Sequence, residues 1–319
     1  MEPLMGLVLL VSVLVCAYLA WNIGANDVAN AIGTSVGSRA LTLKQAVVVA
    51  AVFAFIGAFF AGDAVTDTVR KGILVVYFDN QVLVDAISND LMYGFIAAMM
   101  AAAVWLTIAP RYGLPVSTTH CTIGGIIGVG LVMEVQHDTS LIDWEVVEKV
   151  VMSWISSPVM ESPFAFFTFW VIRETILDTT DSEARARWMA PILAIPTFFV
   201  LGLALQFKAL KGFFAKAQEN GWIEVKYDWL PFKEDGSWNP MMDDAWFPST
   251  SLILAGMIAI IAAVILAYIL RNYDFKVEKE GFDGVERIFV WLQVSAAAYV
   301  AVADGANDRS NAIGPMAAV

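Results

Sequence analysis

Apolar runs separated by polar connections form the pattern of this chain. A helix needs about 20 apolar residues to cross the hydrocarbon core of a bilayer. The runs that approach this length are residues 4–21, 46–62, 91–109, 150–172, 189–207, 249–270 and 288–303. A shorter run, 123–133, is long enough only for a half-helix. Because the runs are too long for strands and do not alternate, they predict an all-α polytopic membrane protein.

The composition agrees with lipid as the solvent for most of the chain. Soluble domains are about 45–50% apolar and about 25% charged, whereas this chain is 59% hydrophobic and 16% charged, with a mean hydropathy of +0.67. Its net charge of −12 argues against binding to nucleic acid. The same charge repels anions at long range. An anion site would therefore have to be local, built from helix ends, hydroxyl groups or a bound cation.

The cysteines, the start of the chain and one aromatic-rich stretch carry less information about function. Cys16 and Cys121 lack the spacing of a disulfide framework or a zinc site. The first apolar run has no basic start, so we expect a retained membrane helix and not a signal peptide. The stretch 208–248 is rich in aromatic residues and mixed charge, which is typical either of an interfacial segment or of a solvated connector.

The charges between the runs suggest a topology. We place the N-terminus outside and treat 91–109 and 123–133 as a re-entrant helical hairpin that enters and leaves on one side. Arg39, Arg173 and Arg271 then lie inside, as the positive-inside rule prefers. In this arrangement the run before residue 24 points inward and the run before residue 305 points outward.

Those two runs each lead into a copy of the same motif. Residues 24–33 and 305–314 are identical at eight of ten positions, GANDVANAIG and GANDRSNAIG. Two copies in opposite orientation predict an inverted-topology repeat, an architecture common among secondary transporters. We therefore divide the chain into a first repeat with the hairpin (1–133), connecting helices and the interfacial segment (134–248), and the start of a second inverted repeat (249–319).

The composition of the motif predicts broken helices. Glycine, asparagine and aspartate are poor helix formers, so we expect the helices to unwind at the glycines that bound each copy: Gly24, Gly33, Gly305 and Gly314. Unwound backbone at membrane depth must be buried in protein or line a polar cavity. An ionisable residue there, Asp27 or Asp308, is by default a functional candidate.

The side chains of the motif suit a small hard cation. Amide and carboxylate oxygens favour such an ion over zinc or copper, and in a secondary transporter it would be sodium or a proton. The candidate cation ligands are Asp27, Asn30, Asp308 and Asn311, with sodium expected at Asp27 and Asp308. In the alternative interpretation, these groups only join one helix break to the other by hydrogen bonds.

A second element, Pro115-Val116-Ser117-Thr118-Thr119-His120, follows the run 91–109. Pro115 ends the upstream helix, and the hydroxyl groups of Ser117, Thr118 or Thr119 can cap the next one. A helix N-terminus binds phosphate or carboxylate readily, which gives the local anion site that the net charge requires. In the alternative, the element is an ordinary capped turn.

Two further residues keep two interpretations each. His120 is either a proton carrier or, as we favour, a hydrogen-bonded structural residue. Glu161, in a segment broken by prolines, either lines the cavity or marks a helix bend. The pair of Ser117 and His120 is weak evidence for nucleophilic catalysis, and we predict that the protein is not an enzyme.

Together these elements resemble the PiT family of inorganic phosphate transporters, which also includes retroviral receptors. The residues that carry the resemblance are the two motif copies, residues 115–120, and Ser153-Trp154 with Ser157-Pro158. The resemblance implies phosphate symport with sodium, or with protons in some prokaryotic members, by a dimeric inverted-repeat protein. Sodium would be the coupling ion, with no other cofactor, and the location would be the plasma membrane. It assigns phosphate binding to Ser117, Thr118, Thr119, Asn26 and Asn307.

One departure from the family pattern affects the anion site. Family members carry a second Pro-Ser/Thr element after the second motif, and by the spacing of the first half it would fall beyond Val319. We therefore expect the native protein to continue. The mechanism we predict is alternating access. The alternatives are proton-coupled phosphate or metal-phosphate symport, transport of another oxyanion such as sulfate, an intramembrane hydrolase, and a non-transporting receptor.

Overall fold

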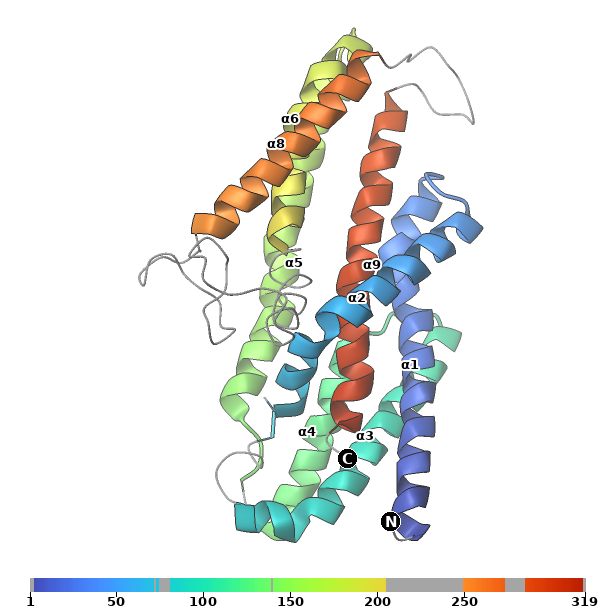
Figure 1. Cartoon of the computed structure of the whole chain (residues 1–319), viewed down its shortest axis with the longest axis vertical. Helices are drawn as coiled ribbons and strands as arrows, with labels where there is room; N and C mark the ends of the chain where they lie inside the picture. The colour runs from blue at the N-terminus through green and yellow to red at the C-terminus, as the bar shows by residue number, and fades with distance from the viewer. Residues whose placement is uncertain are drawn as a thin grey trace, which may run out of the picture. The chain divides into compact units, whose positions relative to one another are not determined.

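A computed structural model describes residues 3–71, 73–74, 81–138, 140–204, 249–272 and 285–317 of the chain. The helices are α1 (Pro3–Gly37), α2 (Leu43–Lys71), α3 (Gln81–Arg111), α4 (Thr118–His137), α5 (Trp144–Ile172), a π-helical turn η2 (Arg173–Leu177), α6 (Ser182–Ala204), α8 (Ser249–Arg271) and α9 (Glu286–Met316) (Figure 1). No strand occurs in these ranges, and extended pairing is limited to a bridge between Leu74 and Ile142. The predicted interfacial segment 208–248 lies outside the described residues.

Eight of the described helices are long and apolar enough to cross a bilayer. The prediction of an all-α, multi-pass membrane protein is therefore confirmed. The prediction of a half-helix at 123–133 is wrong, because α4 is a 20-residue helix from Thr118 to His137. The apolar run underestimates its length, since the polar residues at both of its ends are helical as well. A hairpin of α3 and α4 begins and ends on the same side whether it turns back within the membrane or crosses it twice. The predicted direction of the later spans is therefore the same in both cases, and it stays a prediction.

The prediction of broken helices at the motifs is also wrong. α1 runs without interruption through Gly24 and Gly33, and α9 runs through Gly305 and Gly314. Asn26, Asp27 and Asn311 have hydrogen-bond partners on the segment 116–119, so these side chains do not compete with the backbone of their own helix. A weak helix-forming tendency is overridden by these tertiary contacts.

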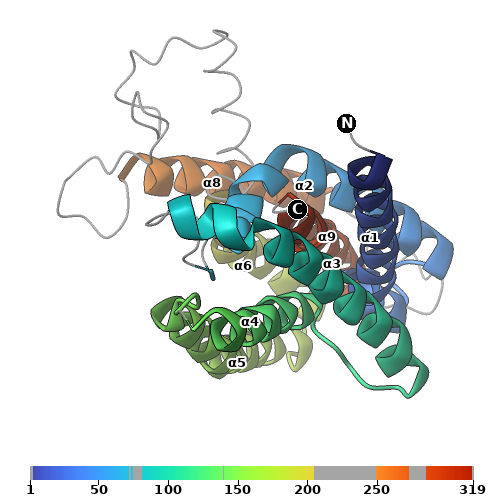
Figure 2. The same ribbon diagram turned by 90° about the horizontal axis from the view of Figure 1, so that it is seen from below.

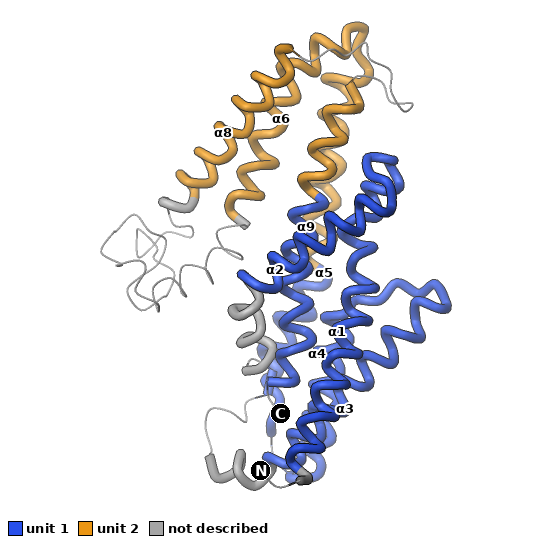
Figure 3. The backbone as a smooth tube through the Cα atoms, turned by 45° about the vertical axis from the view of Figure 1, so that its right-hand side comes forward, with its two compact units in different colours: residues 1–155, 297–319 blue, residues 156–296 orange. Residues whose placement is uncertain are grey.

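The chain divides into two compact units (Figure 3). The first comprises residues 1–155 and 297–319, and the second residues 156–296. The division by repeats, at 133 and 248, follows the sequence and stays a prediction.

In the first unit, small residues bring helices close together. Gly125 of α4 lies against Ala98 of α3, and Gly94 of α3 lies against Val129 of α4. From the first pair to the second the residue number falls on α3 and rises on α4, so the two helices form an antiparallel hairpin, seen in Figure 2. Whether this hairpin re-enters the membrane on one side stays a prediction. A buried cluster joins α1, α3 and α9; its members include Leu19, Ile23, Met99, Leu106 and Ala312.

The second unit uses small residues in the same way. α6 and α8 pack along one another, and fully buried alanines recur every four residues on both helices: Ala186, Ala190 and Ala194 on α6, and Ala255 and Ala259 on α8. Such spacing lets helix backbones approach closely in a membrane. At one end of the pair, the Arg187 guanidinium donates hydrogen bonds to the carbonyl oxygens of Leu270 and Arg271 at 2.6 and 3.2 Å.

Candidate functional site

A polar cavity of about 690 Å³ lies in the first unit where α1, α9 and the start of α4 meet. Its lining residues are Asn26, Asp27, Ala29, Asn30, Pro115, Val116, Ser117, Thr118, Thr119, His120, Asp304 and Asn307. Apart from Ala29, Pro115 and Val116, they carry amides, hydroxyls, two carboxylates and one imidazole, and no lysine or arginine is among them. The cavity thus brings together the first motif, the Pro-Ser-Thr element and part of the second motif, which are far apart in the sequence.

Hydrogen bonds fix the first motif to the segment that begins α4. The Asn26 amide donates to the carbonyl oxygen of Val116 at 2.9 Å, and the Thr118 hydroxyl donates to Asp27 Oδ2 at 2.7 Å. Asn30 Nδ2 donates to Asp27 Oδ1 at 3.3 Å. Both oxygens of Asp27 therefore accept hydrogen bonds, and this holds its carboxylate in one orientation beside the cavity.

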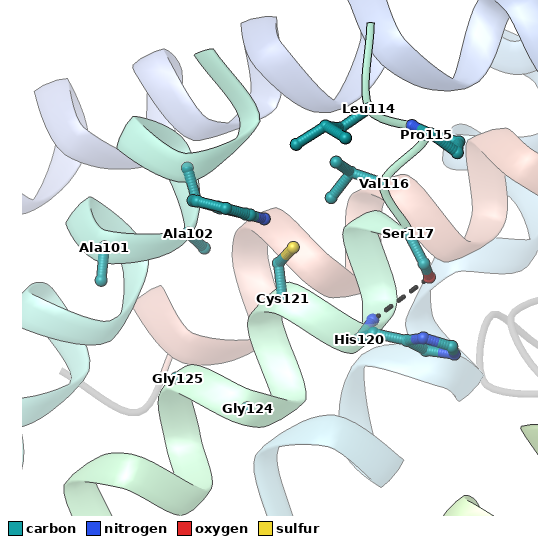
Figure 4. Close-up of a pocket in the computed structure, with 11 residues that line it drawn as sticks. Ala101, Ala102, Leu114, Pro115, Val116, Ser117, His120, Cys121, Gly124 and Gly125 are labelled. Atoms are coloured by element: carbon teal, nitrogen blue, oxygen red, sulfur yellow. Dashed lines mark hydrogen bonds between the residues drawn. The ribbon is translucent and has the colours of Figure 1, made fainter. Parts of the chain in front are cut away.

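The start of α4 presents an anion-binding end to this cavity. Ser117 is the N-cap residue, with extended backbone, and its Oγ accepts a hydrogen bond from the His120 amide at 3.3 Å (Figure 4). The first amides of a helix have no partner within it, and the helix dipole adds a partial positive charge there. Ser117, Thr118 and Thr119 all line the cavity. Since the Thr118 hydroxyl donates its proton to Asp27, the hydroxyls of Ser117 and Thr119 and the first amides of α4 are the donors available to a tetrahedral anion.

The second motif approaches the same place from α9. Asn311 Nδ2 donates to the Thr119 hydroxyl at 2.9 Å. The Asp308 carboxyl is within hydrogen-bonding reach of Asp27 and also interacts electrostatically with Asp304. Its Oδ1 atom is buried and has no hydrogen-bond partner. The two motif copies thus place their aspartates side by side, with Asp308 behind the cavity wall.

α1 and α9 run in opposite directions at this site. The Cys16 thiol contacts the carbonyl oxygen of Ala312 at 3.4 Å, while Asp27, further along α1, meets Asp308, an earlier residue of α9. Figure 1 shows the same antiparallel course from the positions of the two termini. Two copies of one motif therefore face each other head to tail.

Comparison with known proteins identifies the family to which the chain belongs. A family model described as the phosphate transporter family matches residues 23–319. The chain belongs to the phosphate transporter family. This confirms the resemblance inferred from the motifs and the prediction that the protein is not an enzyme.

Relatives of this family member occur in archaea, bacteria and plants. A Pyrococcus furiosus protein named as a putative phosphate permease is 38% identical over 98% of this chain and 65% of its own length. A chloroplastic inorganic phosphate transporter of Arabidopsis thaliana is 34% identical over 94% of this chain and 48% of its own length. A solved structure titled as the sodium-dependent phosphate transporter is 28% identical, with a TM-score of 0.72 over 98% of this chain and 67% of its own. The chain thus spans about two thirds of the length of the archaeal relative.

Most of the predicted site residues of this transporter-family chain gather at one place. Asn26, Asp27, Asn30, Asn307 and the three hydroxyl residues line the cavity. Asp308 and Asn311 do not line it but contact residues that do. Glu161 lies on α5 in the second unit, and its role stays a prediction.

The motif glycines are placed inside helices with different surroundings. A Cβ atom on Gly305 would lie 2.0 Å from the Ala54 carbonyl oxygen, and one on Gly57 would lie 1.9 Å from that of Val302. Gly305 and Gly57 therefore permit α2 and α9 to touch backbone to backbone. At Gly24 and Gly33 a Cβ atom would meet nothing within 4 Å. Gly314 is buried within α9.

His120 lies between two cavities and against an aromatic ring. Its imidazole is 3.9 Å from the Trp154 indole, centroid to centroid, and it lines both the polar cavity and an apolar cavity of about 560 Å³. Figure 4 shows this second cavity beside Leu114, Val116 and Cys121. The stacking favours the structural role inferred from the sequence, with an aromatic contact as well as the backbone hydrogen bond.

Sequence reasoning missed Asp304. It lies one residue before the second motif, and its counterpart before the first motif is Ile23. A carboxylate at the end of an apolar run is a signal of a functional residue, but Asp304 lies outside the ten positions of the repeated motif.

Proposed function

We propose that this chain carries inorganic phosphate across the cell membrane by symport with sodium. The observation that carries the proposal is the polar cavity, which is lined by the capped start of α4 and by Ser117, Thr118, Thr119, Asn26 and Asn307. Because the Thr118 hydroxyl donates its proton to Asp27, the donors for a tetrahedral anion are the hydroxyls of Ser117 and Thr119, the asparagine amides and the first backbone amides of α4, without any cationic side chain. Membership of the phosphate transporter family supports phosphate as that anion.

Sodium fits the oxygen-rich side of the cavity. Asp27 and Asp308 would hold the ion, with Asn30 and Asn311 beside them, and the buried Oδ1 of Asp308 offers an oxygen with no hydrogen-bond partner. Two ionised carboxylates in contact repel each other, and a bound cation offsets that repulsion. Cation binding would therefore prepare the cavity for the anion and couple the two. The solved relative titled as sodium-dependent supports sodium over a proton.

Alternating access follows from the two motif copies. Their antiparallel helices and shared position at one cavity support an inverted repeat in which the two halves move around a fixed site. We infer a homodimer from the family resemblance alone. Transport of sulfate in place of phosphate is the alternative, because the shape of the cavity suits either tetrahedral anion.

The proposal is tested by uptake of labelled phosphate into proteoliposomes, driven by an inward sodium gradient or by a proton gradient. We expect sodium-driven uptake, and we expect Asp27→Asn and Asp308→Asn each to lower it at least tenfold. Glu145→Gln serves as a control, because Glu145 is exposed and its carboxylate pairs with the exposed Lys149. The melting temperature and elution volume of each variant should match those of the unmodified protein. Uptake near the unmodified rate in either aspartate variant would refute the role of that carboxylate.

A further inference from the structure

The cavity proposed to receive an anion is lined by carboxylates. Asp27 and Asp304 face it, and no lysine or arginine does. A negative side chain repels every anion, and only an anion with a hydrogen-bond donor of its own can offset this repulsion by a direct hydrogen bond. This arrangement therefore restricts which tetrahedral anion can bind.

The two carboxylates differ in their place relative to the motif copies. Asp27 accepts hydrogen bonds at both oxygens, from Asn30 and Thr118, and contacts Asp308. Asp304 is the additional carboxylate, since the first copy has the buried Ile23 in its place. The site is thus asymmetric: the shared aspartates of the motif face each other, and one extra carboxylate lies along the cavity.

Phosphate and sulfate have nearly the same shape but differ in their protons. Near neutral pH phosphate keeps one or two protons on its oxygens, whereas sulfate has none. A carboxylate is a hydrogen-bond acceptor only, so it accepts a hydrogen bond from a P–OH group and repels an oxygen of sulfate. Sites that depend on one buried hydrogen bond reject the analogue that lacks it strongly.

We propose that Asp304 is a specificity residue that accepts a hydrogen bond from the P–OH group of phosphate and thereby excludes sulfate. The inference rests on the proposed function, because it assigns the selectivity of the same cavity. It predicts that the cavity prefers any tetrahedral oxyanion that carries a proton near neutral pH, so arsenate binds and sulfate does not.

The test is competition against labelled phosphate by unlabelled phosphate, arsenate and sulfate, on the purified protein in proteoliposomes with saturating sodium. In the unmodified protein we expect arsenate to compete like phosphate and sulfate to compete poorly. In Asp304→Asn, the side-chain amide can donate to any oxyanion oxygen. The ratio of sulfate to phosphate inhibition constants should therefore fall at least tenfold, while the arsenate to phosphate ratio stays constant.

Two further variants separate selectivity from general damage. Asp304→Glu keeps the carboxylate and should keep sulfate excluded. Asp138→Asn makes the same chemical change at an exposed residue outside the cavity, in a left-handed backbone conformation that asparagine tolerates, and should leave every ratio unchanged.

The other outcomes overturn the inference or its premise. If Asp304 instead holds a coupling cation, Asp304→Asn weakens all three anions together, raises the sodium concentration needed for half-maximal uptake and leaves the ratios unchanged. If neither the Asp304→Asn nor the Asp304→Glu protein folds, the ratio of sulfate to phosphate inhibition constants is measured on Asp304→Ser instead. A ratio in that variant equal to that of the unmodified protein refutes the inference. An unmodified protein that takes up no phosphate would overturn the proposed function itself.

Discussion

Gly24 and Gly305 occupy the same position in the two motif copies, yet an added methyl group has opposite consequences at them. A Cβ atom on Gly305 would lie 2.0 Å from the carbonyl oxygen of Ala54 and 2.7 Å from its Cα atom. Non-bonded carbon contacts are optimal near 3.5–4.0 Å, so α2 and α9 would have to separate by roughly 1 Å or more. Because the obstacle is backbone, no side-chain rotation can relieve the clash.

The expected change in the free energy of unfolding follows from the surroundings of Gly305 and Gly24. Overpacking costs about 1–3 kcal/mol and occasionally more, and Gly305→Ala belongs at the upper end because two backbones must move. At Gly24 nothing lies within 4 Å of the added atom, and alanine in a helix is more favourable than glycine by about 0.8–1.0 kcal/mol. We therefore expect Gly24→Ala to be neutral or stabilising, and the two variants to differ by about 2–4 kcal/mol in the free energy of unfolding.

The assay is denaturation in detergent micelles followed by tryptophan fluorescence, for which the chain has 11 tryptophans. Gly57→Ala provides an independent check, since its Cβ atom would meet Val302 across the same helix pair and should destabilise like Gly305→Ala. Equal destabilisation by Gly24→Ala would mean that α1 is not a continuous helix at the motif. A neutral Gly305→Ala would mean that α2 and α9 do not touch there.

Three further variants test other parts of the structure. Ala190→Leu places a large side chain in the buried face of α6 against α8 and should lower the free energy of unfolding by about 1–3 kcal/mol, measured in the same assay; Ile192→Leu, at an exposed position, is its control. Gly113→Ala should cost about 1–2 kcal/mol, because Gly113 has a φ of +69°. Thr118→Val removes the hydroxyl that donates to Asp27. It should weaken sodium binding about tenfold in uptake assays, because hydrogen bonds to charged groups contribute about 1.5–3 kcal/mol. Thr118→Ser keeps the hydroxyl and should keep the sodium affinity.

The fold class could be predicted because lipid imposes a simple rule on sequence. An apolar run of sufficient length must be helical, so seven of the spans followed directly from hydropathy. The ends of the helices could not be predicted in this way. α4 begins at Thr118 and ends at His137 because polar residues cap it and continue it, and hydropathy alone reads such residues as loops.

The cavity was predictable as a set of residue types, but the conformation of its motif was not. Asp27 and Thr118 are named from their chemistry and are hydrogen-bonded to each other, while Asn26 is bonded to the neighbouring Val116. The helix break was inferred from intrinsic propensity, which is a weak term of at most about 1 kcal/mol for each of these residues. Hydrogen bonds to Val116 and Thr118, from a segment about ninety residues away in the chain, outweigh that term, and such contacts cannot be read from local sequence.

One of the two positions at which the motif copies differ shows how one sequence serves two surroundings. Val28 packs in an apolar cluster with Ala31 and Ile32, whereas its counterpart Arg309 donates a hydrogen bond to the carbonyl oxygen of Ala58 on α2 at 3.0 Å. The shared asparagines and aspartates contact the cavity or the residues that line it, whereas Val28 and Arg309 fix each helix to its own neighbours. The other differing position does not follow this division, because Ala29 lines the cavity. Asp304, which differs from Ile23 of the first half and also lines the cavity, is a further position at which the two halves of the site differ chemically.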